Sequence, residues 1–240
     1  MSAKHSRNVF MLLVLFFGFT LSQAAPLLKI DEPVFDFGNA PGHAKVSHSF
    51  WLKSAGDDTL KILSVVPGCG CTKAPLEKDK LAPGDSTRLQ VTFSTGSYRG
   101  HVAKSPRIST NEGGTYKTVR ILTNVLTRPD STYPLVVTPH KIDISQFGKK
   151  ERKEVTFTIT NVTPADLTVN LVDVPSDVFT VELPKKVDAG KSAEGKVRLA
   201  GDGDIGDFER SVTFEVNDEQ HTRFTIPVHR EVRSTASASK

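Results

Sequence analysis

Cysteine is nearly absent from this chain: Cys69 and Cys71 are its only two, and one glycine separates them. Two cysteines this close in sequence cannot join distant strands of a domain, so no long-range disulfide is expected to hold the fold together. Three local roles stay open for the Cys69-Gly70-Cys71-Thr72 stretch. It can be a small redox-active ring, a two-thiolate metal clamp, or a structural feature of a tight turn.

Long hydrophobic runs are absent except at the N-terminus. Lys4 and Arg7 precede an apolar run of 13 residues from Val9 to Leu21, and the small residues of Ser22-Gln23-Ala24 follow it. This order is typical of a signal peptide, predicted here over residues 1–24. The run is shorter than the ~20 residues that a membrane-spanning helix needs. We therefore expect an exported protein, periplasmic or extracellular, with no transmembrane segment in the mature chain.

Charge of one sign is not in large excess. The formal net charge of the whole chain is +4, and without Lys4 and Arg7 it falls to +2, from 29 basic and 27 acidic residues. Such a small imbalance does not favour nucleic-acid binding, which needs a clustered basic face. Both methionines, Met1 and Met11, also lie in the predicted signal. The mature chain therefore lacks thioether ligands for copper.

The second half of the chain repeats the first at an offset of about 106 residues. Turn glycines, apolar strand residues and a loop asparagine all recur. A period of this length exceeds the ~20–50 residues of a solenoid unit and fits one β-sandwich domain. The matched positions are Phe37-Gly38 with Phe147-Gly148, Phe50 with Phe157, Gly84 with Gly190, Gly100 with Gly206, Ile108 with Phe214, and Asn111 with Asn217.

Apolar residues alternate with polar ones in short segments such as Leu89-Val91-Phe93 and Phe224-Ile226-Val228, with turn residues between the segments. This pattern is typical of strands that bury one face. The fold class predicted is all-β, with two tandem immunoglobulin-like β-sandwiches. The predicted domains are 26–125, which carries the Cys-Gly-Cys motif, and 133–232, which lacks cysteine; 126–132 is a linker and 233–240 a disordered tail.

The position of the single tryptophan disfavours an antibody-type domain. Such a domain places a tryptophan between two cysteines that are far apart in sequence. Here Trp51 precedes both cysteines, and the second repeat has none. The sequence therefore favours a sandwich without an inter-sheet disulfide. We expect Trp51 to pack in the core or between the domains rather than to form a ligand platform.

The first repeat resembles a bacterial family of exported domains of unknown function that carry a Cys-Gly-Cys-Thr signature. The residues that match are Phe35-Asp36-Phe37-Gly38, Ser49-Phe50-Trp51-Leu52, Cys69-Gly70-Cys71-Thr72, Leu81-Ala82-Pro83-Gly84 and Ile108-Ser109-Thr110-Asn111. That family is similar to the sandwiches of sperm-protein-like and cilia-associated modules. The resemblance covers the first repeat and implies an immunoglobulin-like fold with a binding or assembly role rather than an enzymatic one.

The chemistry of the cysteine pair depends on how the turn is bent. In an extended strand, residues two apart have Cα atoms ~6.5–7 Å apart, at the limit for a disulfide. We expect Gly70 to relax this limit by adopting a positive φ, and Thr72 to complete the turn. A bridge over so short a loop adds little stability, and a strained bridge is easily reduced. A structural turn and a redox pair thus both remain open.

A metal site at Cys69 and Cys71 is the third alternative. Two thiolates suit Cu(I) or Zn²⁺, but a closed site needs further ligands. The candidates nearest in sequence are His43, His48 and His101, which follow no ligand spacing. We therefore expect no cofactor, with copper or zinc kept as an alternative.

Three functions compete. The first is a non-enzymatic binding or structural module of the cell envelope with a protein partner, supported by the export signal, the repeat and the lack of a catalytic motif. The second is a thiol redox or metal-handling protein that uses Cys69 and Cys71. The third is a periplasmic pilus-type chaperone, which also has two immunoglobulin-like domains but whose subunit-anchoring basic residues are not found here. No catalytic residue is predicted.

Overall fold

The computed structural model describes residues 24–148, 152–201 and 205–233, and all of its regular elements are strands. The predicted all-β fold is therefore confirmed. Residues 1–23 of the predicted signal peptide and residues 234–240 of the predicted tail lie outside the described residues. Arg233, expected in the tail, belongs to the last strand. No helix able to span a membrane occurs in the described part of the chain.

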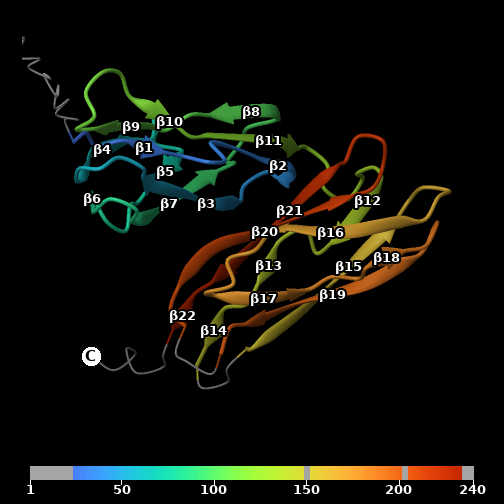
Figure 1. Ribbon diagram of the computed structural model, residues 1–240. Coiled ribbons are helices and arrows are strands. Elements are labelled where there is room, and N and C mark those ends of the chain that lie inside the picture. Colours follow the sequence, from blue (N-terminus) through green and yellow to red (C-terminus); the bar gives the residue numbers. More distant parts are fainter. Residues whose placement is uncertain (1–23, 149–151, 202–204, 234–240) are drawn as a thin grey trace, which may run out of the picture.

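Domain 1 is a sandwich of two layers (Figure 1). One layer has the strand order β1-β3-β7-β5, and the other consists of the sheets β10-β9-β4-β6 and β8-β11-β2. The strands are β1 Leu28–Lys29, β2 Val34–Pro41, β3 Lys45–Ser54, β4 Leu60–Val66, β5 Thr72–Lys73, β6 Lys80–Leu81, β7 Ser86–Ser94, β8 Gly100–Lys104, β9 Arg107–Thr110, β10 Lys117–Thr118 and β11 Arg120–Leu126.

Domain 2 repeats this plan. One layer has the order β12-β15-β19-β17, the other β18-β16-β20-β21 with β13 beside β21, and β14 pairs with β22 at the far end. The strands are β12 Leu135–Thr138, β13 Ile142–Asp143, β14 Gln146–Phe147, β15 Glu154–Asn161, β16 Leu167–Asp173, β17 Phe179–Glu182, β18 Lys186–Val187, β19 Ser192–Leu199, β20 Phe208–Val216, β21 Arg223–Arg230 and β22 Val232–Arg233.

Each domain has its own hydrophobic core between its layers. The cores form because alternate residues of a strand point to opposite faces of its sheet. In β7, Leu89, Val91 and Phe93 are fully buried, while the residues between them are partly exposed. The alternation seen in the sequence therefore marks the core-facing side correctly.

Equivalent residues of the two repeats make equivalent contacts. Asn111 Oδ1 accepts a hydrogen bond from the amide of Lys61, and Asn217 Oδ1 accepts one from Thr168, each over 2.7 Å. The turn glycines Gly84 and Gly190 both have positive φ, at 86° and 66°. Positive φ favours glycine because it has no Cβ. The loop asparagines and the turn glycines that recur in the sequence therefore occupy equivalent positions in the two domains.

Two parts of the repeat differ. Phe37 is fully buried, whereas Phe147 is 62% exposed with Arg233 over its ring, so the match of Phe37-Gly38 with Phe147-Gly148 is not structural. The single strand β20 corresponds to two strands in domain 1, β8 and β9, with Pro106 between them. Proline lacks the amide donor that a continuous ladder needs, which accounts for the break.

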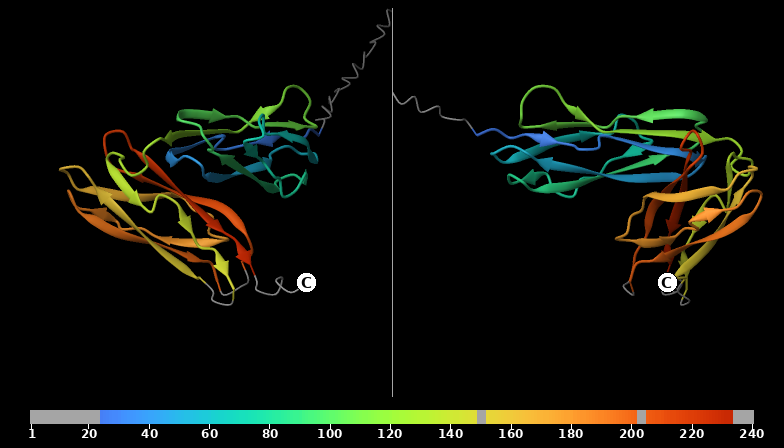
Figure 2. Two further views of the ribbon diagram at one scale, coloured as in Figure 1. Left: turned by 180° about the vertical axis from the view of Figure 1, so that it is seen from behind. Right: turned by 45° about the vertical axis from the view of Figure 1, so that its right-hand side comes forward.

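The two domains share one sheet. β2 of domain 1 pairs in parallel with β21 of domain 2 at Asn39 and Phe224, which joins strands of both domains into an eight-stranded sheet. The domains form an elbow around this junction (Figure 2). Buried hydrogen bonds reinforce it: the Ser47 amide donates to Ser211 Oγ, Ser211 Oγ donates to the Ser47 carbonyl, and Thr225 Oγ1 donates to the Phe37 carbonyl.

Trp51 does not pack in the core. Its side chain is 61% exposed and lines a cleft at the junction together with Arg88 and Asp177. Trp51 lies on β3 between Phe50 and Leu52, which both point into the core of domain 1. The strand period therefore places the tryptophan on the outer face. Of the two positions expected, the core is wrong, and the side chain lies at the junction between the domains.

Candidate functional site

The Cys-Gly-Cys-Thr turn connects β4 to β5 in domain 1. The Thr72 amide donates to the Cys69 carbonyl over 3.3 Å, which closes a turn of four residues. This bend brings the Cα atoms of Cys69 and Cys71 to 5.3 Å, and the two sulfurs form a disulfide. An extended strand would hold these Cα atoms ~6.5–7 Å apart. The turn, not the strand, allows the bridge.

The glycine that bends this segment is Gly68 rather than Gly70. Gly68 has a φ of 87°, in the left-handed region, whereas Gly70 is not among the residues with positive φ. A Cβ added at Gly70 would meet no atom within 4 Å. The positive φ expected at Gly70 therefore belongs to Gly68, one residue before the disulfide ring, and the turn inside the ring forms without a left-handed residue.

The side chain of Cys71 has polar neighbours from a distant segment. Tyr98 Oη lies 3.6 Å from Cys71 Sγ, and Lys104 Nζ donates to Tyr98 Oη over 3.2 Å. The Lys104 ammonium also lies 4.5 Å from the centre of the Tyr98 ring, within range of a cation–π contact. These contacts connect the disulfide to β8, the strand that ends at Lys104.

The backbone holds Cys71 against the core. The Ser94 amide donates to the Cys71 carbonyl over 2.8 Å, and Thr72 pairs with Phe93 on β7. Thr72 itself is buried, and its Oγ1 lies 3.4 Å from Cys69 Sγ. Both cysteines are half-buried, and Gly70 between them is exposed. The ring is thus anchored on the Cys71 side and open to solvent at Gly70.

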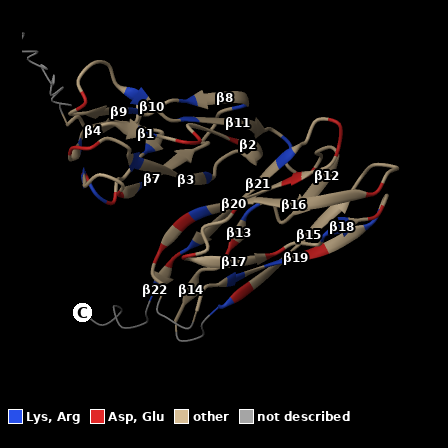
Figure 3. Cartoon of the chain, in the orientation of Figure 1, with Lys and Arg blue, Asp and Glu red and all other residues tan. Residues whose placement is uncertain are grey.

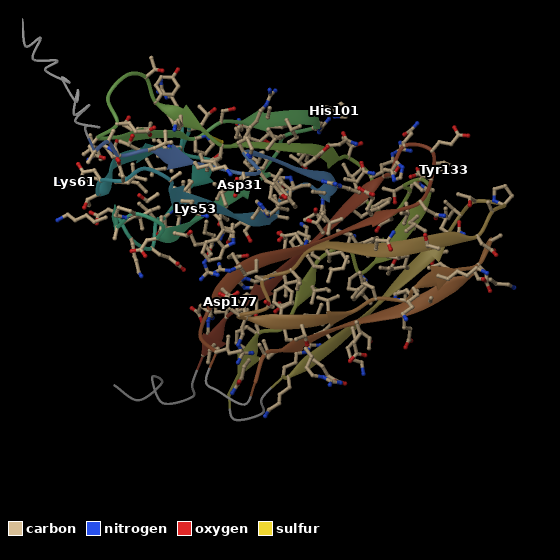
Figure 4. All side chains as sticks on the ribbon, viewed as in Figure 1. Asp31, Lys53, Lys61, His101, Tyr133 and Asp177 are labelled. Carbon is tan, nitrogen blue, oxygen red and sulfur yellow. A yellow bond between two sulfur atoms is a disulfide. The ribbon has the colours of Figure 1, made fainter. Side chains whose placement is uncertain are left out.

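The histidines considered as further metal ligands do not gather around the cysteines. His48 Nδ1 lies 2.9 Å from Asp173 Oδ2 at the domain junction, and its ring stacks on Phe35. His101 is exposed on β8, as Figure 4 shows. Within residues 24–148, 152–201 and 205–233, no group of three His, Cys, Asp or Glu side chains could hold a metal ion.

A second candidate region lies at the junction, and no motif in the sequence indicated it. A groove of about 840 Å³ runs over the outer face of β8, β11 and β2 and is bounded by the turn between β20 and β21. Its charged and imidazole side chains are Asp36, His101, Arg120, Glu215, His221 and Arg223. Residues more than a hundred positions apart meet here, so local sequence pattern carries no signal for it.

Comparison with protein families identifies the chain. A family model described as "Protein of unknown function (DUF1573)" matches residues 28–125 and again residues 135–229. The chain belongs to this family. The DUF1573 match includes the second repeat, so the relationship is not confined to the repeat that carries the cysteines. Each matched segment corresponds to one sandwich.

Several solved structures resemble the chain at low similarity. A protein of unknown function from Porphyromonas gingivalis W83 is 13% identical, covers 85% of this chain and 99% of its own, and has a TM-score of 0.34. An ASH/PapD-like domain of human CEP192 is 10% identical over 52% of this chain and 96% of its own, with a TM-score of 0.34. At these values the likenesses carry no functional inference.

A third resemblance is to WR4, a C. elegans member of the MSP family. It is 15% identical, covers 42% of this chain and all of its own, and has a TM-score of 0.31. No curated protein matches the chain. Function must therefore be argued from this molecule's own surfaces.

Proposed function

We propose that this protein is an exported, non-enzymatic binding module of the cell envelope, in which two sandwiches present their surfaces to a protein partner at a fixed angle. The observation that carries the proposal is the junction: a sheet shared between the domains through Asn39 and Phe224. A shared sheet resists hinge motion more than a flexible linker does. A fixed angle between the two sandwiches would hold a bound partner in one orientation relative to the protein.

The contacts around the junction support a fixed orientation. Ser211 is buried and exchanges two hydrogen bonds with the backbone of Ser47, over 2.9 and 3.0 Å. Lys45 Nζ lies 2.9 Å from Glu209 Oε1, and Arg88 lies 3.0 Å from Asp177 Oδ2, on either side of the buried pair. A buried donor or acceptor that loses its hydrogen-bond partner costs free energy. Separating the two domains at this junction would therefore be unfavourable.

Export is the second part of the proposal. It is supported by the apolar run from Val9 to Leu21 and its basic flank, which lie outside the described residues. The disulfide between Cys69 and Cys71 is consistent with an oxidising compartment.

Cross-linking in the cell that produces the protein tests this function. We expect the wild type to form discrete cross-linked species with a partner, and the variant Cys69→Ser with Cys71→Ser to form the same species. Removing a disulfide that closes so short a loop is expected to cost only about 1–2 kcal/mol, so the variant should fold. Absence of any discrete species from the wild type would contradict a binding role.

Loss of those species in the folded double-serine variant would instead favour the second candidate, thiol redox exchange. The observation that supports it is the closed disulfide with its exposed Gly70. In one exchange cycle a partner dithiol becomes a disulfide, and Cys69 and Cys71 take up its two electrons and two protons. The reduced pair would also offer two thiolates to Cu(I) or Zn²⁺. Titration of the bridge against glutathione, followed by mass, measures its reduction potential.

A further inference from the structure

β8 is an edge strand. It is the last strand of the eight-stranded sheet and pairs only with β11, so its other edge is open among the described residues (Figure 1). The five residues Gly100–Lys104 therefore present about 17 Å of unpaired backbone. An open edge is a template for a further strand.

The edge is open because β4 ends at Val66, before it reaches β8. β4 pairs with β9 as far as Val66 and Arg107, and the chain then leaves the sheet through Pro67 and the disulfide ring. Continued along the same line, β4 would have reached β8. The ring instead lies against the end of β8, through Tyr98 and Lys104.

The corresponding surface of domain 2 is already occupied. The first half of β20 is equivalent to β8, and β3 of domain 1 packs against it. The contacts are the hydrogen bonds of Ser47 with Ser211 and the ion pair of Lys45 with Glu209. The outer face of this strand is thus covered in domain 2 and exposed in domain 1. The backbone edge over Phe208–Val212 of β20 is unpaired among the described residues, as that of β8 is.

The strands around the open edge carry only basic charges, while the groove beside them also contains Asp36 and Glu215. β8, β9, β10 and β11 contain no aspartate or glutamate, and Figure 3 shows only blue on β8 and β11. No carboxylate within salt-bridge distance is found, in the described part of the chain, for the side chains of this group. Its members are Arg99, His101, Lys104, Arg107 and Arg120.

Edge strands often carry a lysine that discourages self-association. That role accounts for Lys104, which lies on the edge strand itself. It does not account for Arg120, which is exposed on the neighbouring strand β11, or for Arg107, which is exposed on β9 of the adjacent sheet and lies over the Tyr116 ring. The basic side chains thus extend beyond the edge strand to the strands next to it in the chain, and this is an arrangement expected where an anionic partner docks.

Building on the proposed function, we propose that β8 binds an extended acidic segment of the partner protein as an additional strand. Side chains of the added strand would alternate between two faces. Those on the outer face would lie beside His101 and the groove that contains Arg120. Those on the inner face would lie beside Lys104 and Tyr98 at the disulfide ring. Backbone hydrogen bonds supply the affinity, and the cations select carboxylates.

The test uses a short fluorescein-labelled peptide of alternating valine and glutamate, with a valine–lysine peptide as its control. Fluorescence anisotropy is measured with the full mature protein at low and at physiological ionic strength. We expect the acidic peptide to bind and the basic peptide not to bind. The variant His101→Glu with Arg120→Glu is expected to weaken binding by about ten-fold or more. Both side chains are exposed, so the variant should fold.

Lys53→Glu is the matched charge control. Lys53 is exposed on β3, in the other layer of domain 1 (Figure 4), and its reversal should leave the affinity within about two-fold, because screening removes most distant effects. Equal weakening by Lys53→Glu, or equal binding of the basic peptide, would overturn the proposal.

Hydrogen exchange distinguishes strand addition from attachment of the peptide to the charged surface alone. Addition of the acidic peptide should slow amide exchange within Gly100–Lys104. It should leave β17, the edge strand Phe179–Glu182 of domain 2, unchanged. Binding without protection of β8 would contradict strand addition.

The partner cross-links separate this inference from the proposed function. If they persist in the His101→Glu, Arg120→Glu variant, the protein binds its partner through another surface, and only the role of β8 is refuted. If the wild type forms none, the proposed function itself fails.

Discussion

At the scale of single residues, the spacing of residues in the sequence does not give the backbone φ angles of Gly68 and Gly70. It also does not give the hydrogen-bond partners of the buried Arg230. A glycine between two cysteines suggested that Gly70 bends the chain, but the positive φ belongs to Gly68. Gly70 is flanked by the two cysteines, whereas Gly68 follows Pro67, and a Pro-Gly pair is itself a turn signal that the assignment to Gly70 passed over. The disulfide and the hydrogen bond from Thr72 to Cys69 hold the ring without a left-handed residue inside it.

Paired alanine substitutions test this assignment. Gly68→Ala places a Cβ on a left-handed residue and is expected to lower the free energy of unfolding by about 1–2 kcal/mol. Gly70→Ala has open space around its Cβ and should change it by less than about 0.5 kcal/mol. Urea unfolding of both variants measures the two changes in the free energy of unfolding. A larger loss of stability for Gly70→Ala than for Gly68→Ala would show that Gly70 is the residue that needs the conformational freedom of glycine.

Arg230 is the largest fully buried side chain of the described residues, and nothing in the sequence marked it. Its guanidinium donates to the carbonyls of Ile205 and Ile144 over 2.8 and 2.9 Å, and to Gln146 Oε1 over 3.2 Å. Arg230 thus connects β21 to β14 and to the segments that contain Ile144 and Ile205. Polar acceptors left without a donor in the interior are costly.

We therefore expect Arg230→Ala to lower the free energy of unfolding of domain 2 by about 2–4 kcal/mol, from unpaired carbonyls and a cavity. Arg233→Ala is the control, because Arg233 is exposed and forms an ion pair with Glu231 at the surface. Thermal unfolding measures both. A loss no larger for Arg230→Ala than for Arg233→Ala would show that the buried guanidinium is not structurally required.

At the scale of elements, the repeat predicted two sandwiches of similar strand order, because loop residues such as Asn111 and Asn217 recur with the same hydrogen bonds. It did not predict the division of one strand into β8 and β9. That division depends on Pro106, at a position where domain 2 has Val212. The sequence shows the proline, but not which neighbours each half of the strand then pairs with.

The loop between β9 and β10 connects to β1 through one carboxylate. Burial alone would raise the pKa of Glu112, but hydrogen bonds from Lys117, the Leu28 backbone and Thr110 lower it below its usual value. Lys117 Nζ also donates to the Leu28 carbonyl. A carboxyl group with a depressed pKa contributes stability above its unfolded-state pKa and loses it as pH falls through the folded-state value.

Glu112→Gln should therefore destabilise domain 1 at pH 7, and the difference from the wild type should shrink as the pH falls below the unfolded value of 4.5. Urea unfolding from pH 7 down to pH 3 follows this difference. Glu32→Gln, at an exposed carboxyl group of the same domain, is the control. A difference that is the same at both ends of the pH range would show that the charge of Glu112 does not matter.

At the scale of the whole molecule, the sequence predicted two domains but not the sheet that joins them. β2 and β21 pair through residues 185 positions apart, Asn39 and Phe224. Strand periodicity identifies which face of a strand is buried, but it does not identify the neighbouring strand. The same reason kept the groove at the junction and the open edge of β8 out of the sequence-based account.

Residual dipolar couplings of the backbone amides test the central claim, that the two sandwiches act as one rigid elbow. Couplings are measured for the mature protein in a weakly aligning medium, and an alignment tensor is fitted to each domain separately. The junction predicts the same tensor for both domains in the orientation of Figure 2. Two tensors of different magnitude would show that the domains move independently, and would contradict a module that presents its surfaces at a fixed angle.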